Sequence, residues 1–177
     1  MPSSIAKHWT FDHSRVFLNH GSFRACPDFV IAEQRKWQNL MEREPVRFFE
    51  ELMPDLLLKS REALGSFLSC SADDLAFVSN ATSGVNTILR SLHFEEGDEI
   101  LVPNHAYQAC RNTIDFVAGR WGAKVVEVAI PFPIDGSETV VELMKSACSE
   151  RTKLVMIDTV TSPTGLRMPF EELTAFF

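Results

Sequence analysis

The sequence has no long apolar run, no paired cysteines and no excess of basic residues, and each absence excludes a class of protein. No stretch of about 20 apolar residues could span a membrane, and residues 1–12 lack the apolar core of a signal peptide. The four cysteines form no Cys-x-x-Cys pair, so neither a zinc site nor a disulfide framework is predicted. The net charge of -7 at pH 7 argues against a nucleic-acid partner. We therefore expect a cytoplasmic protein without metal, membrane or nucleic acid.

Three glycine fingerprints are also absent. The chain has no Gly-x-Gly-x-x-Gly and no Gly-x-x-x-x-Gly-Lys-Ser/Thr, which a dinucleotide or P-loop site needs for its phosphates. It has no Gly-x-Ser-x-Gly, the turn that presents the nucleophile of a serine hydrolase. A nucleotide-binding α/β domain is therefore a distant alternative.

From Ala76 onward, apolar strand-like runs alternate with helical spacing. Strands are predicted at 76–79, 99–103, 124–130 and 153–158. Helices are predicted at 82–92, in the segment that Gly122 ends, after Ser137 as N-cap, and from Pro169. This alternation is typical of a mainly parallel sheet with flanking helices, so the predicted fold class is α/β.

Three polar segments follow predicted strands, at 80–83, 104–107 and 158–165. Because the carboxyl ends of parallel strands meet at one edge, a ligand pocket is expected there. The turn at Asn80 presents the N–H groups of a helix N-terminus, which favour a phosphate. The alternative is that Asn80, Thr82 and Ser83 only cap the helix.

The N-terminal part of the sequence has a helical pattern without predicted strands. Helices are predicted at 27–44 and 54–67, and their apolar stripes indicate a core or docking surface rather than chemistry. Before them, Asn19, His20 and Gly21 suggest a tight turn. His20 could act as a ligand or proton carrier, although a lone histidine in a turn is more often a hydrogen-bonding residue.

Five motifs in order make the chain similar to a known family. They are Leu18-Asn19-His20-Gly21-Ser22-Phe23, Asn80-Ala81-Thr82-Ser83-Gly84-Val85-Asn86, Gly97-Asp98-Glu99-Ile100-Leu101, Tyr107-Gln108-Ala109 and Thr161-Ser162-Pro163-Thr164-Gly165. The chain resembles the class V aminotransferases, pyridoxal-phosphate (PLP) enzymes of fold type I, and within them the isopenicillin N epimerase-like branch. The resemblance implies the N-terminal part of a fold type I large domain. It also implies a single incomplete domain over 1–177, with an arm and helices at 1–70 and the PLP-binding part at 71–177.

The resemblance also implies a cofactor site. Ala81 and Thr82 match the phosphate cup, through backbone N–H groups and the Thr82 hydroxyl. Tyr107 matches the aromatic position that stacks on the pyridine ring, and Ser162 matches the position near the phenolic oxygen of the cofactor. These residues would bind pyridoxal 5'-phosphate.

On the substrate side, Asn19 and His20 match the segment that approaches an amino-acid substrate. The family implies a homodimer and chemistry at the substrate α-carbon, which includes epimerisation, carbon–sulfur cleavage and transamination. The motifs do not choose among these reactions.

Catalysis in the family depends on two groups that no residue of this chain matches. The lysine that forms the Schiff base and the aspartate that pairs with the pyridinium nitrogen lie later in the family than the matched segment. Asp158 aligns too early for the second role and is not assigned it. With its phenylalanines at 176 and 177 inside a predicted helix, the chain is expected to be a fragment. The alternative function is a non-catalytic fragment, or a binding or assembly module that needs a C-terminal partner segment.

Overall fold

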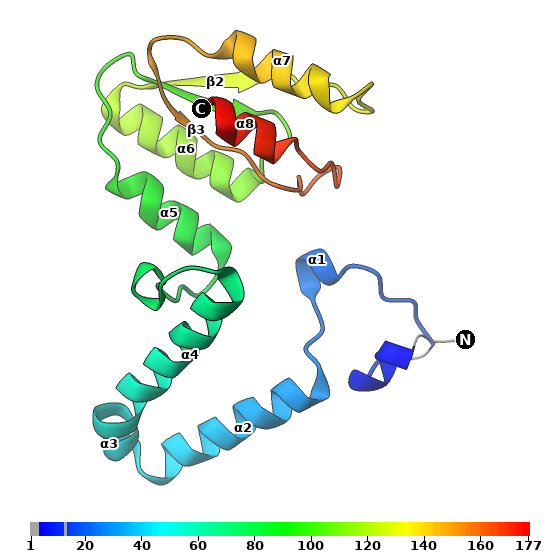
Figure 1. Cartoon of the computed structure of the whole chain (residues 1–177), viewed down its shortest axis with the longest axis vertical. Coiled ribbons are helices and arrows are strands. Elements are labelled where there is room, and N and C mark those ends of the chain that lie inside the picture. The colour runs from blue at the N-terminus through cyan, green and yellow to red at the C-terminus, as the bar shows by residue number, and fades with distance from the viewer. Residues whose placement is uncertain (1–3, 13) are drawn as a thin grey trace. The chain divides into compact units, whose positions relative to one another are not determined.

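The computed structural model describes residues 4–12 and 14–177 of the chain. These residues form two compact units, a first unit that extends to Ala76 and a second unit from Phe77 to Phe177 (Figure 1). The prediction of a single incomplete domain, divided near residue 70, stays a prediction.

The first unit is helical. Its longest helices are α2 (Asp28–Arg43) and α4 (Met53–Leu68), which confirms the two helices predicted at 27–44 and 54–67. The shorter elements are η1 (Ser4–His8), α1 (His20–Phe23), α3 (Pro45–Arg47), the π-helical turn η2 (Phe48–Leu52) and η3 (Ala72–Asp74). Pro54 lies in the first turn of α4, where its missing N–H costs nothing.

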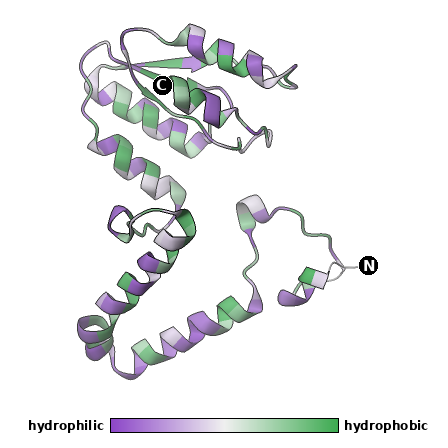
Figure 2. Ribbon diagram, in the orientation of Figure 1, coloured by the Kyte–Doolittle hydropathy of each residue, from purple (hydrophilic) through white to green (hydrophobic). Residues whose placement is uncertain are grey.

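Many apolar side chains of the first unit lie open to solvent, and others, such as Leu56, are half-buried. Among its described residues, only Gly65 is buried. Phe29 and Trp37 of α2 are 65% and 41% exposed, and Leu57 of α4 is 44% exposed. Figure 2 shows these helices as alternating hydrophobic and hydrophilic residues. The stripes predicted on these helices therefore form an open apolar surface rather than an internal core.

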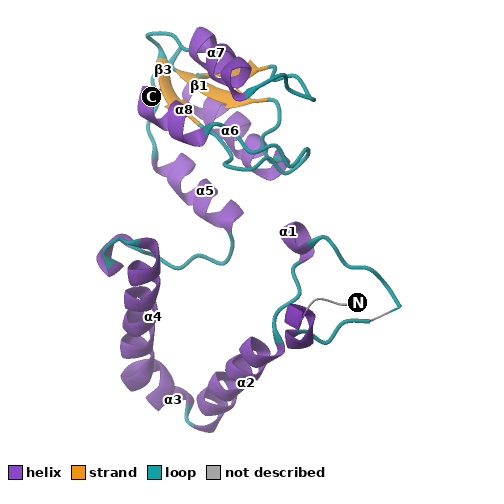
Figure 3. Ribbon diagram, turned by 45° about the vertical axis from the view of Figure 1, so that its right-hand side comes forward, coloured by secondary structure: helices purple, strands orange, loops and turns teal. Residues whose placement is uncertain are grey.

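The second unit is built on a three-stranded parallel sheet (Figure 3). Its strands are β1 (Glu99–Pro103), β2 (Lys124–Val128) and β3 (Thr152–Val155), in the order β2-β1-β3. Glu99 is paired with Lys124 on one side and with Thr152 on the other. The predicted parallel sheet is confirmed, and β1 is its central strand.

Four helices cover the two faces of this sheet. They are α5 (Ala81–Ser91), α6 (Gln108–Trp121), α7 (Ser137–Ala147) and α8 (Phe170–Phe176). Ile100 and Val102 pack with residues of α5 and α6, whereas Leu101 packs with residues of α7 and α8. Successive side chains of a strand point to opposite faces, so β1 supplies both cores.

Several predicted boundaries differ from the structure. The predicted strand 76–79 is wrong: Phe77 and Val78 are 53% and 52% exposed, and no strand pairs with them among the described residues. A strand without a neighbour has no ladder of hydrogen bonds to hold it. Strands β2 and β3 are shorter than predicted, and Gly136 rather than Ser137 is the N-cap of α7. Gly122 follows α6 with a φ of 70°, as expected for a helix-ending glycine.

The packing predicts very different costs for two isoleucines in helices. Ile114 of α6 is fully buried, whereas Ile88 of α5 is 63% exposed. Ile114→Ala should lower the free energy of unfolding by about 2–5 kcal/mol, because it removes buried contacts and leaves a cavity. The matched control Ile88→Ala should change it by less than about 0.5 kcal/mol. Urea unfolding followed by far-ultraviolet circular dichroism measures both values, and equal losses would contradict the described core.

Candidate functional site

Two polar loops meet at the carboxyl edge of the sheet. The backbone N–H of Tyr107, after β1, donates to Asp158 Oδ2, after β3, over 3.1 Å. Close by, His105 Nδ1 lies 3.1 Å from Thr164 Oγ1. Two of the three polar segments that the sequence places at this edge are therefore joined by direct hydrogen bonds.

The third segment is the N-terminus of α5. Asn80 is its N-cap, and the Asn80 side chain accepts a hydrogen bond of 2.8 Å from the N–H of Ser83. The N–H groups of Ala81 and Thr82 have no acceptor among the described residues. Gly84 and Met156 line one groove, so the first turn of α5 lies beside the end of β3. The capping predicted for Asn80 is observed, and two donors stay open beyond it.

The predicted site residues fall into two groups. Ala81, Thr82, Tyr107 and Ser162 all belong to the second unit. Tyr107 is the N-cap of α6 and is 44% exposed, and Ser162 lies exposed in the loop after β3. Their assignment to a cofactor stays a prediction.

Asn19 and His20 belong to the first unit. The Asn19 carbonyl oxygen accepts a hydrogen bond of 3.2 Å from the N–H of Phe23. The His20 ring lies edge-on to Phe17, with 4.7 Å between ring centroids. These contacts make His20 part of an aromatic cluster, and its predicted role toward a substrate stays a prediction.

Asp158 sets the electrostatics at the start of α6. Its carboxylate accepts the Tyr107 N–H, where negative charge is favourable beside a helix N-terminus. Burial and, to a lesser extent, the charge of Asp158 raise the pKa of the Cys110 thiol, so Cys110 stays protonated at neutral pH. A protonated, buried thiol is a poor nucleophile, and Cys110 is a core residue rather than a reactive one.

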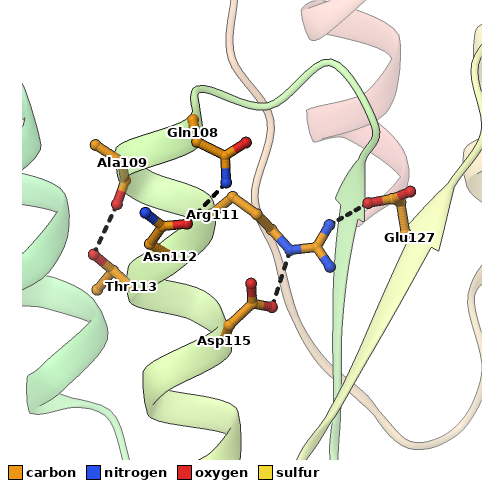
Figure 4. Close-up of polar contacts among 7 residues, drawn as sticks. All are labelled: Gln108, Ala109, Arg111, Asn112, Thr113, Asp115 and Glu127. Carbon is orange, nitrogen blue, oxygen red and sulfur yellow. Dashed lines mark hydrogen bonds and ion pairs between the residues drawn. The ribbon is translucent and has the colours of Figure 1, made fainter.

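Arg111 ties the first turns of α6 to the end of β2 (Figure 4). Its guanidinium donates to Asp115 over 3.0 Å and forms an ion pair with Glu127 of β2. Partial burial alone would lower the Arg111 pKa, but hydrogen bonds and charges of both carboxylates outweigh it and raise that pKa. Arg111 therefore stays charged and holds α6, which Tyr107 precedes, against the sheet.

The sequence does not single out Asp158 or His105 as the residues that join the loops. The partner of Asp158 is a backbone N–H 51 positions away, and those of His105 lie 25 and 59 positions away. No local motif marks such contacts, because only the folded sheet brings the loops together.

Residues 4–12 and 14–177 contain neither a metal site nor a membrane-spanning helix. No cluster of three histidine, cysteine or acidic side chains there has the geometry to hold a metal ion. None of the helices in that part of the chain combines the length and apolarity needed to cross a bilayer.

The fold, a parallel sheet between two layers of helices, is shared with a solved structure of a PLP enzyme. A C-DES mutant with glycine covalently linked to its PLP cofactor superposes with a TM-score of 0.80 at 16% identity. The match covers 99% of this chain and 45% of that one. At this identity the likeness shows the fold alone, and it confirms the predicted fold class.

The sequence comparison gives the family. Residues 28–177 match the model of the class-V aminotransferases, and the chain belongs to that family. It is 31% identical to a probable chloroplastic L-cysteine desulfhydrase of Arabidopsis thaliana, over 94% of this chain and 38% of the relative. It is 33% identical to the isopenicillin N epimerase of Amycolatopsis lactamdurans, over 93% and 42% respectively. The chain thus spans less than half the length of these relatives.

The cap of α5 gives a testable stability difference. Asn80→Ala should lower the free energy of unfolding by about 1 kcal/mol, because it leaves the Ser83 N–H without its acceptor. Asn80→Asp keeps an acceptor there and should leave the stability nearly unchanged. Asn112→Ala, at an exposed position inside α6, is the matched control. Urea unfolding of the three variants measures the effect, and a harmless Asn80→Ala would contradict the described cap.

Proposed function

We propose that this chain supplies the phosphate- and ring-binding part of a PLP site in an enzyme that acts at the α-carbon of an amino acid. The observation that carries the proposal is the pair of open N–H donors at the N-terminus of α5. The first turn of α5 shares a groove with Met156 at the end of β3, and the exposed residue Tyr107 follows β1. Open donors at a helix N-terminus suit a phosphate, and an exposed aromatic face suits a pyridine ring.

The resemblance to the family gives each residue a proposed role. The N–H groups of Ala81 and Thr82 and the Thr82 hydroxyl would donate to the cofactor phosphate. Tyr107 would stack on the ring, and the Ser162 hydroxyl would hydrogen-bond its phenolic oxygen. Asn19 and His20 would contact the amino-acid substrate. When bound, PLP supplies an electron sink that labilises a bond at the substrate α-carbon.

The position of the lysines supports a site without its own nucleophile. Lys124 begins β2 and Lys153 is the second residue of β3, so both lie at the amino end of the sheet. Lys145, in the last turn of α7, lies over the Phe176 ring at 4.5 Å. No lysine of the chain, those of the first unit included, matches the Schiff-base motif of the family. The proposal therefore includes a Schiff-base lysine from outside this chain, and no turnover by the 177-residue chain alone.

The remaining parts of the proposal follow from the family. A PLP enzyme of this kind would act as a homodimer on a small-molecule amino-acid substrate. A cytoplasmic location is proposed for this chain, whereas the Arabidopsis thaliana relative is described as chloroplastic. Epimerisation, carbon–sulfur cleavage and transamination share their first steps at the substrate α-carbon. The proposal therefore names the class of reaction and not one of the three.

The phosphate assignment predicts a loss of affinity in one variant. Thr82→Val should weaken PLP binding to the purified chain by about tenfold, because a hydroxyl bonded to a charged phosphate is lost. Thr87→Val, on the same helix with its hydroxyl bonded to Ser83, is the matched control and should bind like the parent. Titration followed by PLP absorbance and intrinsic fluorescence measures both affinities.

Borohydride reduction completes this experiment. We expect mass analysis to find no stoichiometric adduct on any single lysine. Equal affinity of the Thr82→Val and Thr87→Val variants would sink the phosphate assignment. A complete adduct on one lysine, or turnover of an amino acid by the chain alone, would show a nucleophile that the proposal lacks.

A second candidate function, an assembly module, is favoured by the open edge of β3. Among the described strands, β3 pairs only with β1. An apolar groove of about 350 Å³ flanks β3 on the α5 side, with Ile88 on its wall. A groove of about 380 Å³, lined by Phe176 and Phe177, flanks it on the other face. A strand with apolar side chains on both faces would fill both grooves. Its backbone would also pair with the free N–H and C=O groups at the edge of β3.

This second candidate also predicts a specific result. The chain, mixed with the part of the A. lactamdurans epimerase that follows the matched segment, should form a one-to-one complex. Ile88→Glu should weaken that complex at least about tenfold, because it buries an unpaired carboxylate. Phe116→Glu, at a 51% exposed position of α6 outside the groove, is the control. Light scattering after size exclusion measures complex formation by both variants. If Ile88→Glu forms the complex as well as the parent does, the β3 edge is not the binding surface.

A further inference from the structure

His105 is a buried histidine between the loops of the candidate site. Its side chain is 7% exposed, and Thr161 nearby is 2% exposed. No buried side-chain nitrogen or oxygen of the described residues lacks a hydrogen-bond partner. A buried polar group left without a partner would cost about 1–3 kcal/mol, so this cluster depends on every bond in it.

The partners of the His105 ring decide where its proton lies. The Nε2 atom is 3.0 Å from the carbonyl oxygen of Ile130, which can only accept, so Nε2 carries the proton. In the neutral ring, Nδ1 is then an acceptor, and the Thr164 hydroxyl donates to it over 3.1 Å. Both ring nitrogens are engaged, and His105 has no nitrogen left for a substrate.

The same reasoning fixes the bonds beyond Thr164. Its hydroxyl proton is used on His105, so its oxygen accepts from the Thr161 hydroxyl over 2.7 Å. The Leu166 carbonyl oxygen, at 3.3 Å, is the more distant of the two possible acceptors of that hydroxyl. The Thr161 oxygen in turn accepts from the N–H of Leu166 over 3.0 Å. A directed chain of bonds thus runs from Leu166 through both threonines to His105.

This series of hydrogen bonds connects three segments of the sheet edge. Ile130 follows β2, and its N–H and carbonyl are also bonded to the Asn104 side chain, at 3.0 Å and 3.3 Å. Ser162 lies between Thr161 and Thr164, and Tyr107 lies two residues after His105. Fixing His105 therefore constrains the backbone that carries both exposed side chains.

We propose that His105, with a proton on Nε2 and with Nδ1 as an acceptor, is a positioning residue. It holds the loop that carries Ser162 against the loop that carries Tyr107. The assignment of Ser162 and Tyr107 to PLP rests on the proposed function, whereas the bond directions do not. The proposal deepens that function by naming a residue that orients the site without touching the cofactor.

The first test reads the His105 ring in the cofactor-free chain. Nitrogen-15 labelling of histidine and two-bond proton–nitrogen spectra distinguish the two neutral forms of each ring. We expect one form for His105, protonated on Nε2, and its disappearance in His105→Phe identifies the signal. A ring protonated on Nδ1 would overturn the proposal.

The second test uses the isosteric variant Thr164→Val, which removes the donor to His105. Amide exchange at Thr161 and Leu166 should speed up by roughly tenfold, because their mutual bonds lose the tie to His105. Thr164→Ser keeps the hydroxyl and should restore slow exchange. Thr174→Val, on an exposed position of α8, should leave it unchanged. Unchanged exchange in Thr164→Val would overturn the proposal.

PLP titration of the same variants separates this proposal from the proposed function. We expect Thr164→Val to bind PLP about tenfold more weakly and Thr164→Ser to bind like the parent chain. A parent chain that binds no PLP would refute the proposed function, while the exchange experiment would still decide the role of His105. If the parent binds and Thr164→Val binds equally well, the positioning role is overturned and the cofactor site stands.

Discussion

The second unit depends on the burial of β1 on both faces. Ile100, Leu101 and Val102 are all 0% exposed, and they alternate between the helix layer of α5 and α6 and that of α7 and α8. A strand that is buried on both faces must be paired on both edges, and β2 and β3 supply those partners. The layers, the strand order and the direction of the carboxyl edge all follow from this one strand.

The polar loops depend on the same strand for their position. They follow the carboxyl ends of β1, β2 and β3, where backbone groups leave the ladder and need other partners. Asn104, His105 and Asp158 supply those partners, each to a segment distant in sequence. The candidate site is therefore a rigid edge with two open features, the N–H groups that begin α5 and the face of Tyr107.

The sequence predicted the parts of this unit that periodicity controls. Alternating strands and helices, the glycine that ends α6 and the polar edge all follow from local patterns, and the structure contains them. The segment 76–79 looked like a strand because its composition suits one, but pairing is a long-range property that composition does not encode. The contacts of His105 and Asp158 were hidden for the same reason. The residues that touch a cofactor could be predicted only from the family motifs.

The strand order also has a consequence for the synthesis of the chain. The central strand β1 precedes β2 and β3 in sequence, so it leaves the ribosome before either neighbour. The helices α5 and α6 precede β2 as well, and they can cover one face of β1 before any sheet exists. β2 then adds to one edge and β3, after α7, to the other. The sheet can therefore form from its central strand outward, because each later strand finds an unpaired edge of β1 already synthesised.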